Sequence, residues 1–423
     1  MESGPLIEPL PPNRPEADES PYAVLQHRDF SLYLAARFIA ALGQQMLTVA
    51  VGWELYERTH SSLALGMVGL TQMVPMILLI LPAGHVADNY ERKRTILGMV
   101  FLATLSSAGL SLISALHGHV LWIYGCLFAA GVARTFLWPA SQAFLPQLVP
   151  RRIFSRAVTW NTGAFHLSSV LGPAAGGALI ALTHNATVVY AINAVATLIC
   201  LALIALVRSR QTVIPRTEMS LESLLAGFKF VYQTKIILGT ITLDLFAVLL
   251  GGATALLPVY AKDILHAGPS GLGILQAALP LGSVMSAIFL AHRPPLERAG
   301  RALIWSVIAF GMSTIAFGLS PWFWLSFAML FVCGAVDNVS VVVRHTLVQL
   351  LTPDEMRGRV SAVNSLFIGT SNELGGFESG LVAQLFGPVA SVVTGGVGTI
   401  LVVIATALHW PEIRRYGRLD GSA

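Results

Sequence analysis

The stretch GHVADNYERKRTIL, residues 84–97, places a glycine, an aspartate and three consecutive basic residues between two long apolar runs. Hydrophobic residues make up 55% of the 423-residue chain, and charged residues only 11%. A soluble domain carries about 25% charged residues, and charge is costly inside a bilayer. The sequence therefore predicts an all-α polytopic membrane protein in which this stretch links two spans.

Twelve apolar runs are long enough to cross a bilayer, which takes about 20 helical residues. They cover residues 31–56, 62–83, 95–115, 119–144, 157–182, 186–207, 236–261, 270–292, 302–319, 322–344, 360–383 and 388–409. Of the 26 Lys and Arg residues, 21 fall in the tails and in the loops on one side of these spans, and two fall in the opposite loops. Because cytoplasmic loops carry the excess of basic residues, we expect a multi-pass protein of the plasma (bacterial inner) membrane with both termini in the cytoplasm.

A polar segment divides the spans into six and six. We expect a disordered cytoplasmic tail, a six-helix bundle, a cytoplasmic linker with a short amphipathic helix, a second six-helix bundle and a second cytoplasmic tail, over residues 1–28, 29–207, 208–235, 236–410 and 411–423. The stretch LAHRPPLERAGRAL, residues 290–303, has the basic character of the opening stretch at the corresponding place in the second half, without its aspartate. Two pseudo-symmetric halves around a central cavity are the architecture of secondary transporters.

The opening stretch resembles the loop signature of the major facilitator superfamily, G-x-x-x-D-[RK]-x-G-[RK]-[RK]-[RK]. The matching residues are Gly84, Asp88, Arg92, Lys93 and Arg94, whereas Asn89 and Glu91 depart from the pattern. The YER at 90–92 resembles the transmembrane secretion effector branch, which includes the enterobactin exporter, and so do SLLAGFKF and VRHTLVQLLTPDEMRGRVSAVNSLF. The resemblance spans nearly the whole chain and implies twelve transmembrane helices in the 6+6 major facilitator fold.

Two interpretations of the opening stretch stay open. The resemblance implies that the loop latches the two halves in the outward-facing state, whereas the basic residues by themselves indicate a topological anchor that can also bind anionic lipid. We expect Asp88 to lie in the loop before the third span, where its carboxylate can accept hydrogen bonds from helix N-terminal N–H groups.

A second stretch, LSSVLGPAAGGALI at 167–180, resembles the antiporter signature of the superfamily. The matching residues are Gly172, Pro173, Gly176 and Gly177. The proline removes a backbone donor and predicts a kink, and the small residues predict a close-packing face. Helix packing without any bearing on transport direction is the alternative.

Ionisable residues inside spans are candidates for function because burying them is costly. Asp244 and Glu373 bracket the predicted membrane midplane, and burial favours their neutral form while a nearby cation favours the charged form, so both are candidates for proton coupling. A permanently hydrogen-bonded pair is the alternative. We expect Asp337, a further coupling candidate, roughly 8–10 Å from the cytoplasm in a structural or gating role. Arg134 has no acid in its own span and requires a partner elsewhere or a bound anion.

The eleventh span carries a polar stripe. Asn364, Ser371 and Glu378 recur every seven residues and so share one helix face. Polar faces in a span point to protein or water, so we expect the stripe to line a cavity or to pack at the interface between the halves.

Other classes of protein lack support. No P-loop, HExxH or nucleophile–base arrangement is present, so we expect neither an enzyme nor an ATP-driven pump. Cys126, Cys200 and Cys333 lie in apolar runs, and we expect no metal and no cofactor. The basic residues follow the spans, which favours membrane topology over a nucleic-acid partner.

The combined features predict a secondary transporter that exports a small amphipathic molecule, siderophore-like or drug-like, by proton antiport and alternating access. The expected partners are the substrate, protons and the bilayer, and the resemblance implies a monomer. Two alternatives remain: a proton-coupled importer of a small metabolite, and a membrane sensor or scaffold that carries no flux.

Overall fold

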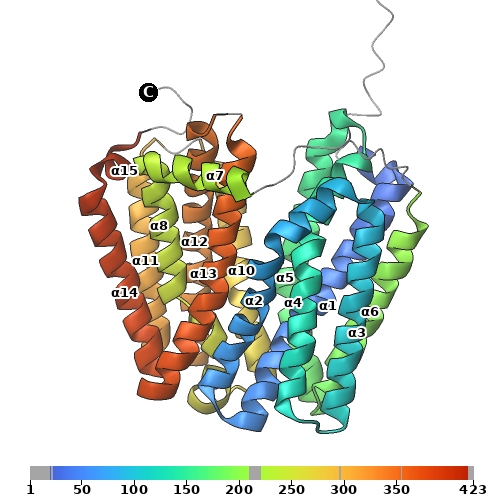
Figure 1. Ribbon diagram of the computed structural model, residues 1–423. Helices are drawn as coiled ribbons and strands as arrows, with labels where there is room; N and C mark the ends of the chain where they lie inside the picture. Colours follow the sequence, from blue (N-terminus) through green and yellow to red (C-terminus); the bar gives the residue numbers. More distant parts are fainter. Residues whose placement is uncertain (1–19, 21, 209–220, 295–296, 354, 418–423) are drawn as a thin grey trace, which may run out of the picture.

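The computed structural model describes residues 20, 22–208, 221–294, 297–353 and 355–417, and these residues form helices and connecting turns (Figure 1). The first group of long helices is α1 (Arg28–Thr59), α2 (Ser62–Asn89), α3 (Arg92–Ala115), α4 (Val120–Phe144), α5 (Phe154–Thr183) and α6 (Thr187–Leu206). The second is α8 (Lys235–Leu250), α10 (Gly268–Ala291), α11 (Ala299–Leu319), α12 (Phe323–Leu351), α13 (Arg357–Phe386) and α14 (Pro388–His409). A chain of short turns, η4 (Ala253–Leu256), α9 (Leu257–Val259) and the π-helical η5 (Tyr260–Ile264), continues α8.

Eleven helical segments of the described residues are long and apolar enough to cross a membrane, which identifies a multi-pass membrane protein. Helix α13 is not among the eleven, although it has 30 residues and coincides with the predicted eleventh span. Its sequence includes two glutamates, two asparagines and several serines, which lower its hydropathy. The polar residues that make this span a functional candidate therefore also explain why its hydropathy is lower than that of the other helices.

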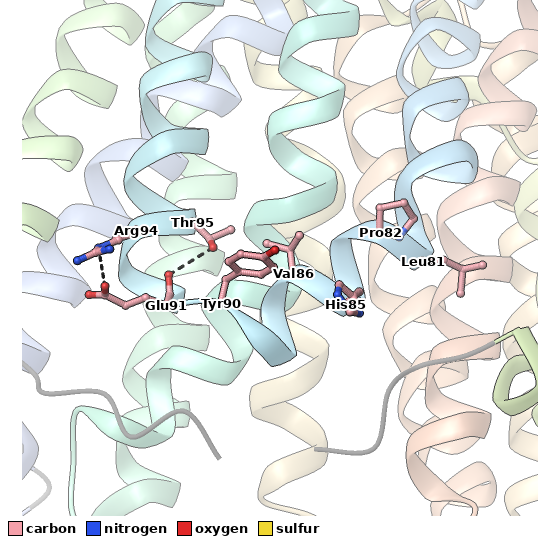
Figure 2. A pocket seen from close by; sticks show the side chains of 8 residues that line it. All are labelled: Leu81, Pro82, His85, Val86, Tyr90, Glu91, Arg94 and Thr95. Atoms are coloured by element: carbon pink, nitrogen blue, oxygen red, sulfur yellow. Dashed lines mark hydrogen bonds and ion pairs between the residues drawn. The ribbon is translucent and has the colours of Figure 1, made fainter. Parts of the chain in front are cut away.

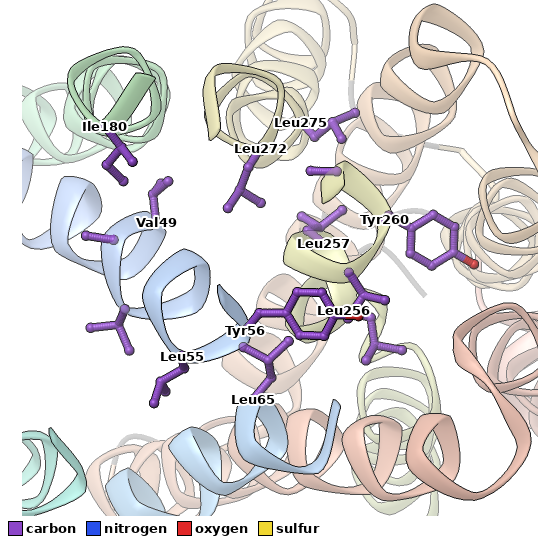
Figure 3. Close-up of a cluster of buried hydrophobic side chains, with 14 of the residues drawn as sticks. Val49, Leu55, Tyr56, Leu65, Ile180, Leu256, Leu257, Tyr260, Leu272 and Leu275 are labelled. Carbon is purple, nitrogen blue, oxygen red and sulfur yellow. The ribbon is translucent and has the colours of Figure 1, made fainter. Parts of the chain in front are cut away.

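The two ends of the bundle differ in how the groups of helices meet. We call the end near residues 28 and 410 the terminal side and the opposite end the distal side. At the distal side, one cluster of buried apolar residues runs through both groups, from α1, α2 and α5 to η4, α9, η5 and α10 (Figure 3). The other three clusters lie at the terminal side within one group each, except that Leu81 of α2 packs against the cluster of α7, α8 and α13. The groups are therefore joined mainly at the distal side, and Figure 1 shows them apart at the terminal side.

Four histidines shape the distal turns. His60, His117, His184 and His266 have positive φ angles between 47° and 52°, and they follow α1, α3, α5 and η5. A left-handed residue after the last helical turn ends a helix, and histidine is among the non-glycine residues enriched in that conformation. The same local device thus ends four helices on one side of the molecule.

The two predicted tails contain more structure than expected, and the linker contains its expected helix. Residues 23–26 form the 3₁₀ turn η1 (Ala23–Gln26) with Val24 fully buried, so the predicted disordered tail is too long at its inner end. Residues 1–19 and 21 of that tail, 209–220 of the linker and 418–423 of the second tail lie outside the described residues. The linker contains the expected helix as α7 (Leu221–Gln233), and the second tail contains α15 (Pro411–Arg415). Backbone N–H groups of Ala299 and Gly300 bond to the carbonyls of Gly417 and Tyr416, which fixes that tail to α11.

Candidate transport site

An ion pair joins the two groups of helices near their mid-depth. A guanidinium nitrogen of Arg134 in α4 lies 2.5 Å from a carboxylate oxygen of Glu373 in α13. Counted from the distal ends of their helices at 1.5 Å per residue, both residues lie about 20 Å in. The Arg134 side chain is 53% exposed and the Glu373 side chain 18%, so the pair is open to the space between the groups. Glu373 is thus the partner that the sequence required for Arg134.

A second ion pair lies inside the second group. Arg344 of α12 pairs with Asp244 of α8, and both side chains are about nine-tenths buried. The Arg344 Nε also donates to the carbonyl of Ser340 at 3.3 Å. Helix α12 continues to Leu351, past the end of the predicted span at residue 344, and Arg344 is buried within it.

Asp337 lies deeper than predicted. The expected depth assumed a span ending at residue 344, whereas α12 runs from Phe323 to Leu351 with Asp337 at its midpoint, roughly 20 Å from either end. The predicted end of this span is therefore wrong, and Asp337 lies farther from the terminal end of its helix than the 8–10 Å that this end implied. Together with Asp244, Asp337 lines a small cavity of about 10 Å³ between α8, α11 and α12.

The predicted polar stripe of α13 faces more than one environment. Ser371 is fully buried and donates to the carbonyl of Ile368 in its own helix, so it does not line an open cavity. Glu378 is half-buried and accepts from the Ser379 hydroxyl at 3.4 Å. Asn364 is half-buried near the terminal side. Glu373, which lies off this stripe, is the residue that reaches the other group.

The link between α2 and α3 is shorter than predicted. Helix α2 continues through Gly84 and Asp88 to Asn89, so Asp88 lies in its last turn and not in a loop. Glu91 precedes α3 without a side-chain capping bond, and among the described residues the Asp88 carboxylate accepts no hydrogen bond from that helix. The predicted capping role of Asp88 is therefore wrong.

The basic residues of this link have separate partners. Lys93 donates to the carbonyls of Ala205 and Val207 at 2.9 and 2.7 Å, where a cation is favoured by the dipole at the C-terminal end of α6. Arg94 pairs with Glu91 at 2.6 Å, and the buried Arg92 donates to the carbonyl of Ala87 at 3.3 Å. An open hollow of about 700 Å³ lies beside the link. Figure 2 shows the side chains that line it, those of Leu81, Pro82, His85, Val86, Tyr90, Glu91, Arg94 and Thr95.

The antiporter-like stretch in α5 divides between two neighbouring helices. A Cβ on Gly172 would lie 2.5 Å from Gln45, and one on Gly176 would lie 2.9 Å from Met46, both in α1 of the same group. A Cβ on Gly177 would lie 2.4 Å from the carbonyl oxygen of Pro269 in α10 of the other group. The stretch therefore has one packing face within its group and one across the interface.

Two helix pairs close the interface through glycines. A Cβ on Gly273 of α10 would lie 2.3 Å from the carbonyl oxygen of Pro173 in α5. In the other pair, a Cβ on Gly69 of α2 would lie 2.4 Å from the carbonyl oxygen of Glu373 in α13. Because backbone faces backbone at both seams, no larger side chain fits while the distal side is closed.

Polar contacts fasten the distal edge of the interface, and we call them the distal clasp. The Tyr56 hydroxyl of α1 donates to Asp263 of η5, and Lys262 pairs with Glu57 at 2.8 Å. The Ser61 hydroxyl, which precedes α2, donates to the amide oxygen of Gln384 in α13 at 3.0 Å. Sequence reasoning missed these residues, although Lys262 is one of only two basic residues in the loops of that side.

We expect reversal of one clasp charge to weaken distal closure modestly. Lys262→Glu replaces the ion pair with two carboxylates, those of residues 57 and 262, which repel each other. An exposed ion pair contributes about 0.2–1 kcal/mol, so the population of the state closed at the distal side should fall up to roughly fivefold. Cross-linking of cysteines placed at 61 and 384 reports that population, and Glu57→Lys combined with Lys262→Glu should restore it. Lys229→Glu in α7 is the control, and equal loss in both single variants would rule out a role for the pair.

Comparisons with known proteins agree with this geometry. The family model described as transmembrane secretion effector matches residues 19–418. The enterobactin exporters EntS of Citrobacter koseri and Escherichia coli O1:K1 are each 29% identical over 92% of this chain and 94% of their own length. These relatives are transporters and not enzymes.

Solved structures share the fold at low sequence identity. A POT family transporter in complex with a thioalcohol-conjugated peptide superposes with a TM-score of 0.73 at 12% identity, covering 91% of this chain and 96% of that one. The nucleoside transporter NupG gives 0.71 at 13% identity, covering 90% and 99%. A bacterial homologue of the lysosomal transporter Spinster, in an inward-facing and unoccupied conformation, gives 0.68 at 15%, covering 92% and 97%.

Proposed function

Because the chain belongs to the transmembrane secretion effector family of the major facilitator superfamily, we propose that it exports a small amphipathic molecule by proton antiport. Siderophore-like and drug-like compounds are the substrate classes, which the similarity to enterobactin exporters supports. The observation that carries the proposal is the Arg134–Glu373 pair, which lies at mid-depth between two groups of helices joined mainly at one side.

We infer twelve spans in two halves, residues 29–207 and 236–410, with both termini in the cytoplasm. The basic residues support this orientation because 21 of the 26 fall in the tails and in the loops predicted on one side of the spans. In this orientation the terminal side is cytoplasmic, and the arrangement corresponds to an inward-facing transporter closed at its distal, outer side. The link after α2 then anchors the chain at the cytoplasmic side through Arg92, Lys93 and Arg94. We also propose that this link latches the two halves together in the outward-facing state.

The substrate enters from the cytoplasmic side toward the ion pair. The Arg134 guanidinium has five N–H donors, and more than half of its side chain is exposed. Exposed aromatic side chains, Trp138 of α4 and Phe165 of α5, offer apolar surface on the same group of helices. An amphipathic molecule matches such surroundings, because its polar groups bind at the ion pair while its apolar part packs on aromatic rings.

Antiport requires that the proton and the substrate exclude each other. Glu373 does this when its ionised carboxylate accepts a hydrogen bond from a donor group of the substrate, because a proton on the same carboxylate removes the negative charge that strengthens this bond. Lower pH then weakens substrate binding. Import by symport predicts the opposite effect of pH on substrate binding. A proton on Glu373 then releases Arg134 to bind an anionic group of the substrate, so lower pH strengthens binding.

Export should depend on both residues of the pair. Each partner has its own task in the proposed mechanism, Arg134 at the substrate and Glu373 at the proton. Glu373→Gln and Arg134→Gln should therefore each lower proton-driven export roughly tenfold or more. The measurement compares small molecules inside and outside cells with and without the protein, and then follows the identified compound in inverted vesicles with an imposed proton gradient. Glu412→Gln, in the short helix α15, is the matched control.

Each alternative predicts a different result. If the compound accumulates inside cells and its binding strengthens at low pH, the protein is an importer and not an exporter. A sensor without flux would move no compound, and its phenotype would survive Glu373→Gln and Asp244→Asn.

A further inference from the structure

The beginning of the described chain is fixed to the first group of helices. The carbonyl of Ser20 accepts a hydrogen bond of 3.0 Å from the guanidinium of Arg156, in the first turn of α5. The ring of Tyr22 lies 5.9 Å from that of Trp160 in the same helix, and Val24 in the turn that follows is fully buried. The residues before Ser20 are therefore tethered beside the start of α5, at the terminal side.

Basic side chains gather at this place. The 3₁₀ turn η3 (Arg151–Ile153) leads from α4 into α5, and its Arg151 and Arg152 are exposed. Together with Arg156 they set three arginines within six residues, and we call these three the link patch. Residues 92–217, which include α3, α4, α5 and α6, contain ten lysines and arginines but no aspartate or glutamate. These four helices and their links therefore supply no carboxylate to the link patch.

Carboxylates are concentrated in the tail that ends at this place. Residues 1–19, which lie outside the described residues, have one base, Arg14, and five acids: Glu2, Glu8, Glu16, Asp18 and Glu19. Three of these acids fall in the four residues directly before Ser20. Because a chain extends by at most about 3.6 Å per residue, the backbone of Glu16 lies within about 14 Å of Ser20. An acidic segment is thus tethered within reach of the link patch.

We propose that the link patch is the docking surface for the acidic segment of residues 16–19 in the chain's own tail. Guanidinium groups present N–H donors in a fork that matches a carboxylate, and such charge-assisted hydrogen bonds are the stronger ones. A single exposed ion pair contributes little, but the short tether to Ser20 gives the segment an effective concentration of the order of mM at the patch.

The docked segment changes what the terminal side of the first group presents. Its three carboxylates neutralise the three arginines of the link patch and hold the chain before α1 to the link between α4 and α5. The family match covers residues 19–418, so almost all of the acidic segment lies outside it. The contact therefore goes beyond the proposed export function and does not depend on it.

Anionic lipid is the competing occupant of the link patch, because arginines next to a membrane attract acidic headgroups. Headgroups have to be recruited from the bilayer, whereas the acidic segment is covalently attached at Ser20, beside the patch. We therefore expect the segment to stay bound in a membrane that contains anionic lipid, and the experiment includes such a membrane.

The test uses the full chain in phosphatidylcholine nanodiscs, with a nitroxide label on Ala17→Cys in a background without Cys126, Cys200 and Cys333. Electron paramagnetic resonance spectra distinguish an immobilised label on a bound segment from a mobile label on a free one. We expect an immobilised component at about 50 mM NaCl that is lost at about 0.5 M, because salt screens exposed charges. An equally mobile label at both salt concentrations would overturn the proposal.

Neutralising the link patch should release the segment. Arg151→Gln combined with Arg152→Gln should lower the ratio of bound to free label roughly fivefold or more. The matched control, Arg298→Gln combined with Arg301→Gln, removes two exposed arginines from the terminal side of the second group and should leave the ratio unchanged. Equal loss in the two double variants would overturn the proposal.

Charge exchange separates docking from a folding defect. Arg151→Glu combined with Arg152→Glu should free the label, and the addition of Glu16→Lys and Asp18→Lys should immobilise it again, which a misfolded protein would not do. Nanodiscs of phosphatidylcholine and phosphatidylglycerol in equal amounts then test the competitor. Immobilisation that persists there supports docking of the segment, whereas release of the label would assign the link patch to lipid headgroups and overturn the proposal.

Discussion

Gly273→Leu is expected to open the distal side of the protein and to abolish transport. A Cβ at this position would lie 2.3 Å from the carbonyl oxygen of Pro173 and 3.1 Å from the Cα of Gly177, so the clash is between backbones and cannot be relieved by a flexible side chain. Overpacking costs about 1–3 kcal/mol, and this contact exists only while the two groups of helices meet at the distal side. At the upper end, the closed state loses roughly 100-fold in population relative to a state in which the seam is open.

The experiment measures closure and transport together. In a background without Cys126, Cys200 and Cys333, cysteines at 61 and 384 should cross-link efficiently with a short bifunctional reagent, because the Ser61 hydroxyl and the Gln384 amide oxygen lie 3.0 Å apart. Gly273→Leu should suppress this cross-link and stop export, since alternating access needs both states. The control is Gly163→Leu in α5, where an added Cβ meets nothing within 4 Å. Full cross-linking in Gly273→Leu would mean that the seam does not hold the distal side closed.

The positions of the helices follow from the sequence because each depends on a local property. Apolar runs of about 20 residues between charged links have few alternatives in a membrane, and eleven of the predicted runs coincide with helical segments long and apolar enough to cross one. The ends of the predicted spans are less accurate, as α12 shows, because its last turn reaches Leu351, past the predicted end of its apolar run. That difference of two turns changed the depth of Asp337.

The ion pairs depend on information that one sequence does not contain. Asp244 and Arg344 lie 100 positions apart, and the pairing of Arg134 with Glu373 depends on how two groups of helices meet. Residue spacing gives the face of a helix but not the neighbour that the face meets. For the same reason the sequence identified Glu373 as important but left open whether the stripe beside it lines a cavity or packs against protein, and Ser371 is fully buried.

The two acid–arginine pairs differ in what can break them. The Arg134–Glu373 pair spans the interface and is partly exposed, so a substrate or a rearrangement of the groups can separate it. The Asp244–Arg344 pair lies within one group and is buried, so it stays together in any rigid-body motion of that group. Breaking the second pair should therefore affect the stability of the group itself.

Arg344→Leu is expected to lower the stability of the protein by about 3–5 kcal/mol, which is the range found when one partner of a buried ion pair is removed. The loss is large here because Asp244 and Asp337 would then share one cavity without any cation. Asp244→Asn combined with Arg344→Leu removes the uncompensated charge and should recover most of that stability. The measurement is thermal unfolding in nanodiscs, with Arg359→Leu at an exposed position of α13 as the control.

The pH dependence of the single variant gives an independent check. In Arg344→Leu the folded protein takes up a proton to remove the unpaired charge, whereas the unfolded chain keeps its aspartates ionised at the same pH. Stability rises as pH falls wherever the folded state binds more protons, so the variant should regain stability in acid and the double variant should respond much less. If the two substitutions are simply additive, and the single variant has the pH response of the unaltered protein, Asp244 and Arg344 do not stabilise the fold as a pair.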